Sequence, residues 1–262
     1  MPLEALIFDM DGTMADTEEA HRQAFNAAFL EHGLSWDWNR QKYTELLLIS
    51  GGRERIDAYV ESLRDRPEEK AKLRQLAASI HRTKTRIYNE LITEGRVPLR
   101  AGVARLVREA RAAGRKLAIA STTSAANVTQ LITNALGGEA YHWFGAIVCG
   151  DHVSHKKPAP DIYELALAEL RLSAPECVAF EDSANGLRAA QAVGLYTVVT
   201  PTFWTEAQDL ASADLLLRDL GDSAAPLDPA GQALVGAPCL ALAQLERLHA
   251  AAAARAALTG AS

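Results

Sequence analysis

Asp9 and Asp11 are the residues of this sequence whose types and spacing point most directly to chemistry. They follow the apolar run Ala5–Phe8, which predicts a short buried strand, and they precede Gly12 and Thr13. Two carboxylates this close together at the end of a strand can share a divalent cation, since hard oxygen ligands suit Mg²⁺, and one of them can act as a nucleophile. The alternative is a β-hairpin, because Asp-Gly between apolar runs favours a tight turn. The next apolar residues argue against a hairpin, because their spacing is helical: Phe25, Ala28 and Phe29.

Polar residues also follow three later predicted strands. Ser121 begins a run of hydroxyl residues that leads into a predicted helix, and hydroxyls and helix N-terminal amides both donate hydrogen bonds to a phosphate. Lys157 offers a positive charge, and the pair Glu181 and Asp182 can complete a metal site. The preceding strands are predicted at 116–120, 146–149 and 178–180.

Each of these residues also has an ordinary structural explanation. Ser121 can be a helix cap, Lys157 can be a solvated lysine like its neighbour Lys156, and Glu181 and Asp182 can form an acidic turn. Their joint appearance at successive strand ends favours function. A parallel sheet brings such ends to one edge, which is where open α/β sheets bind ligands.

The order of the predicted elements indicates an α/β fold. Strands alternate with helices after Pro98, with further strands at 196–199 and 215–217, and this alternation implies a parallel sheet covered on both faces. Between the first strand and Pro98 the sequence predicts only helices, including a long one over 68–94. The sequence therefore predicts a helical insert after the first strand of a parallel sheet.

Composition excludes several classes of function. The chain has 262 residues, of which 48% are hydrophobic and 23% charged, as in ordinary globular proteins. A net charge of −6 argues against a general nucleic-acid binder, so a phosphorylated ligand needs a local cluster of cations. We find neither a signal-peptide pattern nor a membrane-spanning run, and Cys149, Cys177 and Cys239 form no disulfide or zinc pattern. We therefore expect a cytoplasmic protein that binds neither nucleic acid nor membranes.

Taken together, the polar strand ends resemble the four motifs of haloacid dehalogenase superfamily phosphatases. Asp9-x-Asp11-Gly12-Thr13 is similar to the first motif, and the other three motifs are matched by Ser121, by Lys157 and by Glu181-Asp182. The helical insert resembles the subfamily I cap, and the resemblance covers about residues 3–220. Several segments resemble the CbbY group, which includes a xylulose-1,5-bisphosphate phosphatase and is a neighbour of the β-phosphoglucomutases. These segments are 17–19, 50–56, 81–85, 156–158 and 180–186.

The resemblance implies a domain organisation. A Rossmann-like core would be formed by residues 1–16 and 96–220, and a helical cap inserted after the first strand by residues 17–95. Residues 221–262 do not match the group and form a C-terminal extension. Within the extension, the Gly, Pro and Asp content of 221–238 predicts a loop, and the alanine-rich stretch 240–258 predicts a helix.

The resemblance also implies roles for the acidic residues. Asp9 would attack phosphorus and form an aspartyl-phosphate, and Asp11 would protonate the leaving oxygen and then deprotonate a water. Mg²⁺ would be held by the Asp9 carboxylate, the Asp11 backbone carbonyl and Asp182, with Glu181 supporting the metal ligands.

Other residues would bind the substrate. Ser121, Thr122 and Lys157 would hold the oxygens of the transferred phosphoryl group. Arg53 stands where close relatives are expected to have lysine, and the two side chains differ in geometry, so the exact substrate stays open. A solvated helix face is the alternative for each cap residue. The further candidates for substrate contact are Glu18, His21, Gly51, Gly52, Arg53, His81, Lys84, Thr123 and Asn127.

The sequence thus predicts a Mg²⁺-dependent phosphatase of phosphorylated sugars that acts through an aspartyl-phosphate. A sugar bisphosphate such as xylulose-1,5-bisphosphate is the first expectation for its small-molecule partner. One alternative is a β-phosphoglucomutase-type phosphomutase, which uses the same intermediate. Another is a non-catalytic member that binds phosphorylated ligands, which would require a lost catalytic group, and none is missing. The oligomeric state stays open, with a monomer slightly favoured.

Overall fold

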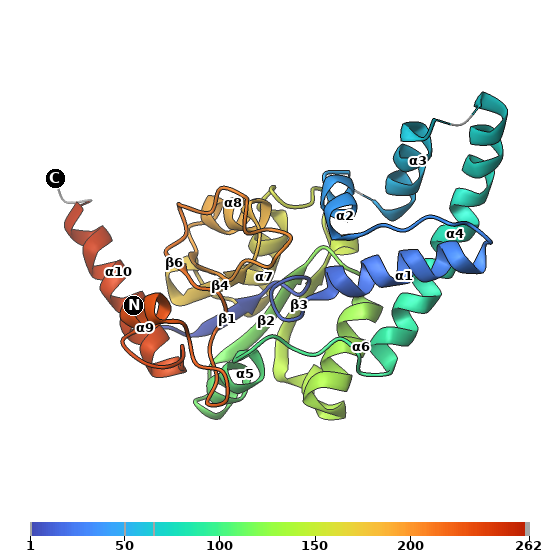
Figure 1. Ribbon diagram of the computed structural model, residues 1–262. Helices are drawn as coiled ribbons and strands as arrows, with labels where there is room; N and C mark the ends of the chain where they lie inside the picture. The colour runs from blue at the N-terminus through green and yellow to red at the C-terminus, as the bar shows by residue number, and fades with distance from the viewer. Residues whose placement is uncertain (1, 50, 65, 260–262) are drawn as a thin grey trace. The chain divides into compact units, whose positions relative to one another are not determined.

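The computed structural model describes residues 2–49, 51–64 and 66–259. Ser50 of the glycine-containing cap segment and residues 260–262 of the predicted extension lie outside the described residues. The chain forms two compact units, which we call the core unit (residues 1–16 and 98–262) and the cap unit (residues 17–97). Figure 1 shows the elements of both.

The core unit contains a six-stranded sheet in the order β3-β2-β1-β4-β5-β6, and every strand pair is parallel. β1 lies between β2 and β4, with Phe8 opposite both Ile119 and Phe180. The chain therefore leaves β1 at Asp9 between the ends of its two neighbours. The strands are β1 (Ala5–Phe8), β2 (Lys116–Ser121), β3 (Phe144–Cys149), β4 (Cys177–Glu181), β5 (Tyr196–Val199) and β6 (Leu215–Leu216). The predicted α/β fold is confirmed.

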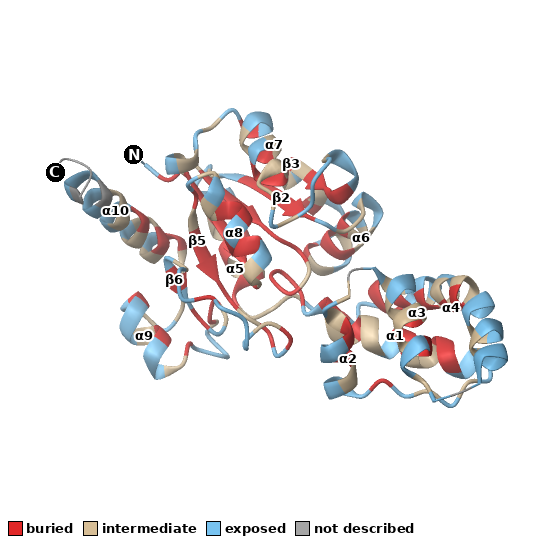
Figure 2. Ribbon diagram, turned by 90° about the horizontal axis from the view of Figure 1, so that it is seen from above, coloured by how far each residue is buried: buried red, intermediate tan, exposed pale blue. Residues whose placement is uncertain are grey.

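Helices cover both faces of this sheet. α7 (Asp161–Leu170) and α8 (Ala184–Ala192) pack on one face, where Ile7 of β1 belongs to their apolar cluster. α5 (Val103–Ala112) lies on the opposite face from α8 (Figure 1). All of β1 is buried as a result, which explains why it reads as a continuous apolar run. Figure 2 shows the buried residues concentrated along the strands. The connections also contain α6 (Ala125–Leu136) and the 3₁₀ helices η1 (Gly138–Trp143), η2 (Gly150–His152) and η3 (Ala174–Glu176).

Among its described residues the cap unit contains helices and no strand, as predicted. Its long helix α4 begins with Pro67 in the first turn, where a missing amide hydrogen costs nothing, followed by Glu68 and Glu69, which suit the helix dipole. Its aromatic core joins Phe25 and Phe29 of α1 with Trp38. The helices are α1 (Thr17–Glu31), α2 (Arg40–Leu47), α3 (Gly52–Ser62) and α4 (Pro67–Thr93).

The extension is more ordered than its composition predicts. The prediction of a loop over 221–238 is wrong for α9 (Pro229–Val235). The Asp228 side chain accepts a hydrogen bond from Gly231 N at 2.7 Å, and Gly236, with φ 72°, ends the helix. Residues that suggested a loop therefore start and stop a short helix. The predicted alanine-rich helix is α10 (Leu242–Thr259), and Glu246 on it accepts from Arg115 at 2.9 Å. Among the described residues, none of the helices is long and apolar enough to cross a membrane.

Candidate active site

Lys157 joins the ends of three strands of the sheet. Its ammonium group donates to Asp9 Oδ1 at 2.7 Å, to the Ala120 carbonyl at 2.8 Å and to Glu181 Oε1 at 2.6 Å. The side chain of Lys157 is only 7% exposed. Burial alone would lower its pKa, but the Asp9 and Glu181 carboxylates outweigh burial and raise the pKa, so this lysine is positively charged. The structure thus brings together Asp9, Lys157 and Glu181, as the strand-end argument predicts.

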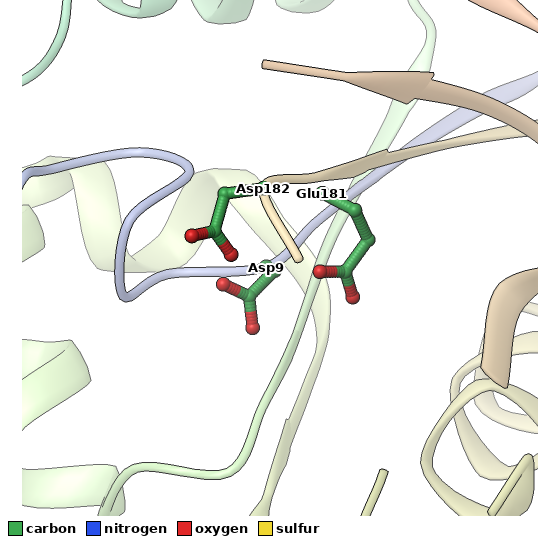
Figure 3. Close-up of side chains that lie close together, drawn as sticks. All are labelled: Asp9, Glu181 and Asp182. Carbon is green, nitrogen blue, oxygen red and sulfur yellow. The ribbon is translucent and has the colours of Figure 1, made fainter. Parts of the chain in front are cut away.

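Asp9, Glu181 and Asp182 form a buried acidic cluster. Each offers a carboxylate oxygen within 4.8 Å of the others, and Figure 3 shows Asp9 lying between the other two side chains. Burial, followed by the charges of Asp9 and Glu181, raises the pKa of Asp182 well above its ordinary value. Three acidic groups around one lysine leave an excess of negative charge, which a divalent cation would balance.

The contacts of Glu181 separate it from the other two acids. Its Oε1 accepts from Lys157 and also from the Tyr163 hydroxyl at 2.5 Å, while Asp182 Oδ2 accepts from Thr205 at 3.2 Å. Burial raises the pKa of Glu181, against the opposing attraction of Lys157. Glu181 is held by protein groups on the side of α7, which suits a residue that supports metal ligands. Asp9 and Asp182 remain the carboxylates best suited to bind the cation directly.

Asp11 lies on a tight turn, which we call the catalytic turn (Met10–Ala15). Gly12 N donates to the Ala15 carbonyl at 2.8 Å, and Met14 N donates to the Met10 carbonyl at 3.0 Å. Gly12 has φ 84°, and a Cβ atom there would lie 2.3 Å from Asp182 Oδ2, so the turn requires glycine on both grounds. The Asp-Gly pair therefore belongs to a turn that leads from β1 toward α1, and the hairpin alternative is wrong.

The hydroxyl run after β2 is ordered by its own hydrogen bonds. Ser121 is fully buried, and its Oγ accepts from Thr123 N at 3.4 Å. Asn127 donates from its side chain to Thr123 Oγ1 at 3.3 Å and from its backbone to Ser124 Oγ, which caps α6. Thr122 is exposed. The bond from Lys157 to the Ala120 carbonyl places these hydroxyls on the same sheet edge as the acidic cluster.

Within the cap unit, Glu18 belongs to a chain of polar contacts. It accepts a hydrogen bond from the Tyr43 hydroxyl at 2.8 Å, and Arg55 donates to the same hydroxyl at 3.2 Å. Arg55 also donates to the Ile49 carbonyl at 2.9 Å, which ties the start of α3 to the segment after α2. A carboxylate, a phenol and a guanidinium are therefore held in one place.

His21 and Lys84 form a second polar pair in the cap unit. Lys84 Nζ lies 2.8 Å from His21 Nδ1, and the His21 ring stacks on Tyr88 with the centroids 3.8 Å apart. Lys84 also lies over the rings of Phe25 and Tyr88, at 5.1 and 5.0 Å from their centroids. Burial, and next the charge of Lys84, lower the pKa of His21 well below its ordinary value. His21 is therefore neutral and lies beside a buried cation.

The remaining cap candidates lie around the start of α3. A Cβ atom on Gly52 would lie 2.7 Å from His81 Nε2, so glycine allows the imidazole to approach the backbone. Burial, and next Lys84, lower the pKa of His81. Gly51 has φ 95°. Arg53 is 59% exposed and lies 3.8 Å from Asp57, so the predicted phosphate partner is a solvated side chain in this structure.

Several polar residues of these clusters were not predicted from the sequence. Tyr163 is one of the buried residues of α7, and because a buried tyrosine hydroxyl needs a hydrogen-bond partner, its position on the apolar side of a predicted helix could have indicated one. The remaining ones gave no signal, because their partners are distant in sequence: they are Tyr43, Arg55, Tyr88 and Thr205.

Comparisons with known proteins agree with this geometry. The family model described as haloacid dehalogenase-like hydrolase matches residues 3–194. Protein CbbY encoded on a plasmid of Cupriavidus necator is 47% identical over 225 residues, which cover 86% of this chain and 89% of that protein.

Two crystal structures of CbbY from Rhodobacter sphaeroides are also similar. The structure in complex with phosphate is 45% identical with a TM-score of 0.70, covering 83% of this chain and 94% of that chain. The structure of a mutant in complex with xylulose-1,5-bisphosphate is 44% identical, again with a TM-score of 0.70, covering 85% of this chain and 98% of that chain. Helices α1–α4, inserted after β1, form a cap of the kind expected for subfamily I.

Proposed function

This chain belongs to the haloacid dehalogenase-like hydrolase family and is a phosphatase of the CbbY type, and on this premise we propose that its substrate is a sugar bisphosphate, with xylulose-1,5-bisphosphate as the first candidate. The observation that carries the proposal is the relative that binds this bisphosphate and is 44% identical over 85% of the chain. Buried Lys84 and half-buried Arg55 of the cap unit support it, because a second phosphate requires positive charge away from the reacting one.

In the proposed reaction, Asp9 is the nucleophile. Its carboxylate attacks phosphorus, the bond from phosphorus to the sugar oxygen breaks, and an aspartyl-phosphate forms on Asp9. Asp11 gives its proton to the departing sugar oxygen, since an alkoxide leaves poorly without protonation. Lys157, held 2.7 Å from Asp9, supplies positive charge to the oxygens of the transferred group, and Ser121 and Thr122 donate hydrogen bonds to them.

The second half of the proposed reaction restores the enzyme. Asp11, now a carboxylate, takes a proton from a water molecule, and the resulting hydroxide attacks the phosphorus of the aspartyl-phosphate. The bond from phosphorus to the Asp9 oxygen breaks, inorganic phosphate leaves, and Asp11 is again protonated. Asp11 is half-buried, whereas the other residues of the catalytic turn are buried, and this partial exposure suits a group that exchanges protons with water.

The acidic cluster fits a bound Mg²⁺. The cluster offers three buried carboxylate oxygens within 4.8 Å of one another. Glu181 already accepts hydrogen bonds from Lys157 and Tyr163, so Asp9 and Asp182 are the proposed hard oxygen ligands. The backbone carbonyl of Asp11 is the proposed third ligand. When bound, the cation would offset the repulsion between the Asp9 carboxylate and the anionic phosphate.

The cap unit is proposed to bind the part of the substrate that does not react. Lys84 is the strongest candidate for the second phosphate, because it is buried and lies beside the neutral ring of His21. Glu18 and Arg55, linked through Tyr43, suit sugar hydroxyls and a phosphate respectively. The exposed Arg53 has the weaker support in this structure.

The test is phosphate release with Mg²⁺ across a small panel of substrates. The panel contains xylulose-1,5-bisphosphate, ribulose-1,5-bisphosphate, phosphoglycolate, and β-glucose-1-phosphate with and without its bisphosphate. We expect the highest kcat/KM for xylulose-1,5-bisphosphate and no release by Asp9→Asn. Conversion of β-glucose-1-phosphate to the 6-phosphate with little phosphate released would establish the mutase alternative in place of the proposal.

A further inference from the structure

Arg100 lies where the chain re-enters the core unit after the cap, and backbone carbonyls surround its guanidinium. Its Nη1 donates to the carbonyls of Gly12 and Thr200 and, at 3.1 Å, to the hydroxyl of Thr200. Its Nη2 donates to the carbonyls of Pro201 at 2.9 Å and Arg218 at 2.8 Å. A single side chain thereby contacts residues that lie 88 to 118 positions from it in the sequence.

Two of these segments contain or contact acidic residues of the candidate active site. Gly12 belongs to the catalytic turn and directly follows Asp11. Thr200 and Pro201 begin the loop after β5, and Thr205 of the same loop donates to Asp182 Oδ2 at 3.2 Å. Arg100 therefore connects the turn that carries Asp11 to the loop that orients Asp182.

The backbone around Arg100 is attached to the same turn. Arg100 N donates to the Met14 carbonyl at 2.8 Å, and Leu99 forms an antiparallel bridge with Ala15. Arg100 thus binds the catalytic turn twice: its backbone amide donates to the Met14 carbonyl, and its side chain donates to the Gly12 carbonyl. The side-chain hydrogen bonds of Arg100 go to backbone carbonyls and to the Thr200 hydroxyl rather than to the carboxylates of the cluster, so Arg100 acts on the acids through the segments that carry or contact them.

Arginine is suited to this place for two reasons. The guanidinium is a rigid planar fork with five N–H donors, so it spans carbonyls that approach from different segments, whereas the single ammonium of lysine does not. Burial lowers the pKa of Arg100, and the charges of Asp182, Asp16 and Asp219 oppose that shift, which suits a side chain that stays charged at any ordinary pH.

We propose that Arg100 is a positioning residue that holds the catalytic turn, and with it Asp11, in the place from which Asp11 protonates the leaving oxygen. This inference rests on the proposed function, in which Asp11 is the general acid. A positioning role for Arg100 predicts a kinetic effect that a purely structural role does not. Loss of Arg100 lowers kcat/KM, which reports formation of the aspartyl-phosphate, for substrates whose leaving group needs a proton, and it largely spares kcat/KM for substrates whose leaving group does not.

The experiment compares two substrates, xylulose-1,5-bisphosphate and p-nitrophenyl phosphate, in the wild type, Arg100→Gln and Arg100→Lys. A sugar alkoxide needs the proton of Asp11, whereas p-nitrophenolate departs without it. We expect Arg100→Gln to lower kcat/KM for the sugar bisphosphate by about 10²-fold, with KM changed by less than about threefold, and to lower kcat/KM for the aryl phosphate by less than about tenfold. Arg100→Lys keeps the positive charge, and we expect it to show the same selective loss in smaller degree.

Arg105 provides a matched control. Its Nη2 also donates to backbone carbonyls, those of Gly221 at 3.0 Å and Leu240 at 3.2 Å, but these belong to the extension and not to the catalytic turn. Arg105→Gln should lower thermal stability yet keep the ratio of the two kcat/KM values within about twofold of wild type. Equal losses for both substrates in the two Arg100 variants, or the same selective loss in Arg105→Gln, would overturn the proposal. A wild type that hydrolyses neither substrate would instead overturn the proposed function itself, and the inference with it.

Discussion

Lys157 in the core unit and Lys84 in the cap unit are both almost fully buried, but their surroundings differ in kind. Lys157 donates to two carboxylates, those of Asp9 and Glu181. Lys84 lies against an imidazole and over the faces of two aromatic rings. Opposite charges hold the first cation and offset its charge, whereas the faces of aromatic rings contribute to the stabilisation of the second.

The difference indicates how each unit uses its charge. In the core unit, Lys157 belongs to a network with Asp9 and Glu181, and its removal leaves these buried carboxylates without a positive partner. We therefore expect folding stability and the proposed reaction to depend on the same ammonium group. In the cap unit, the contacts with His21 and the rings hold the lysine beside an imidazole and two aromatic faces. We therefore expect core variants to lose folding stability and turnover together, and cap variants to lose substrate affinity alone.

Lys157→Met should show the largest effect and tests the core half of the comparison. Methionine fits the space but leaves Asp9 and Glu181 buried without their cation, so we expect the free energy of unfolding to fall by about 3–5 kcal/mol. Phosphate release should fall by about 10²–10³-fold, because the transferred phosphoryl group loses a positive charge. Urea denaturation and steady-state kinetics measure the two effects.

Lys156→Met is the matched control for that variant, because Lys156 is the exposed neighbour. It should leave both quantities unchanged, since an exposed lysine contributes little to stability. A Lys157→Met protein that is as stable as the Lys156→Met protein would show that the carboxylates do not need this cation, and the contrast between the two units would fail.

These two lysines also show how much the sequence could reveal. Lys157 was predictable because its partners lie at strand ends, and a parallel sheet places all strand ends at one edge whatever the details of packing. The role of Tyr163 as a second hydrogen-bond donor to Glu181 was not predictable, because it depends on how α7 packs on the sheet.

The polar contacts within the cap unit, in contrast, could not be predicted from the sequence. His21 and Lys84 were named as candidates, but their contact depends on the packing of α1 against α4, and helical spacing alone does not determine which residues meet across two helices. The contacts of Tyr43 with Glu18 and Arg55 join three helices and had no counterpart in the sequence pattern. The turn chemistry of the extension was likewise misread, since Asp228 and Pro229 mark a helix start as readily as a loop.

Lys84→Met should have the second largest effect and tests the cap half of the comparison. We expect KM for the sugar bisphosphate to rise by about 10–100-fold with kcat changed by less than about threefold, because a charged contact to a group that does not react contributes to binding and not to chemistry. The free energy of unfolding should change by less than about 1 kcal/mol, since methionine packs well against aromatic rings.

Lys72→Met, an exposed position on the same helix, is the control and should leave KM unchanged. An unchanged KM in Lys84→Met would remove Lys84 from the substrate site. A large loss of stability in Lys84→Met would remove the difference between the two lysines from which the comparison starts.

The smallest expected effect concerns the neutral histidine beside Lys84. Burial, and next the charge of Lys84, hold the pKa of His21 well below its ordinary value, so the folded chain binds fewer protons here than the unfolded chain does. The contribution of His21 to stability is therefore complete above the pKa of an unfolded histidine, about 6.5, and is lost progressively as the pH falls below it. Between about pH 7.5 and about pH 5.5, the wild type should lose on the order of 1 kcal/mol more of its unfolding free energy than His21→Gln.

The same measurement on Lys84→Met connects this histidine to the comparison of the two units. Because the charge of Lys84 is one cause of the low pKa of His21, its removal should weaken the pH dependence without abolishing it, since burial is the larger cause. Urea titrations of the wild type and the two variants at both pH values give the result. If His21→Gln keeps the full wild-type dependence, the titrating group lies elsewhere. If Lys84→Met keeps the full wild-type pH dependence, the charge of Lys84 does not act on His21. The difference between the two buried lysines that their surroundings indicate would then be wrong.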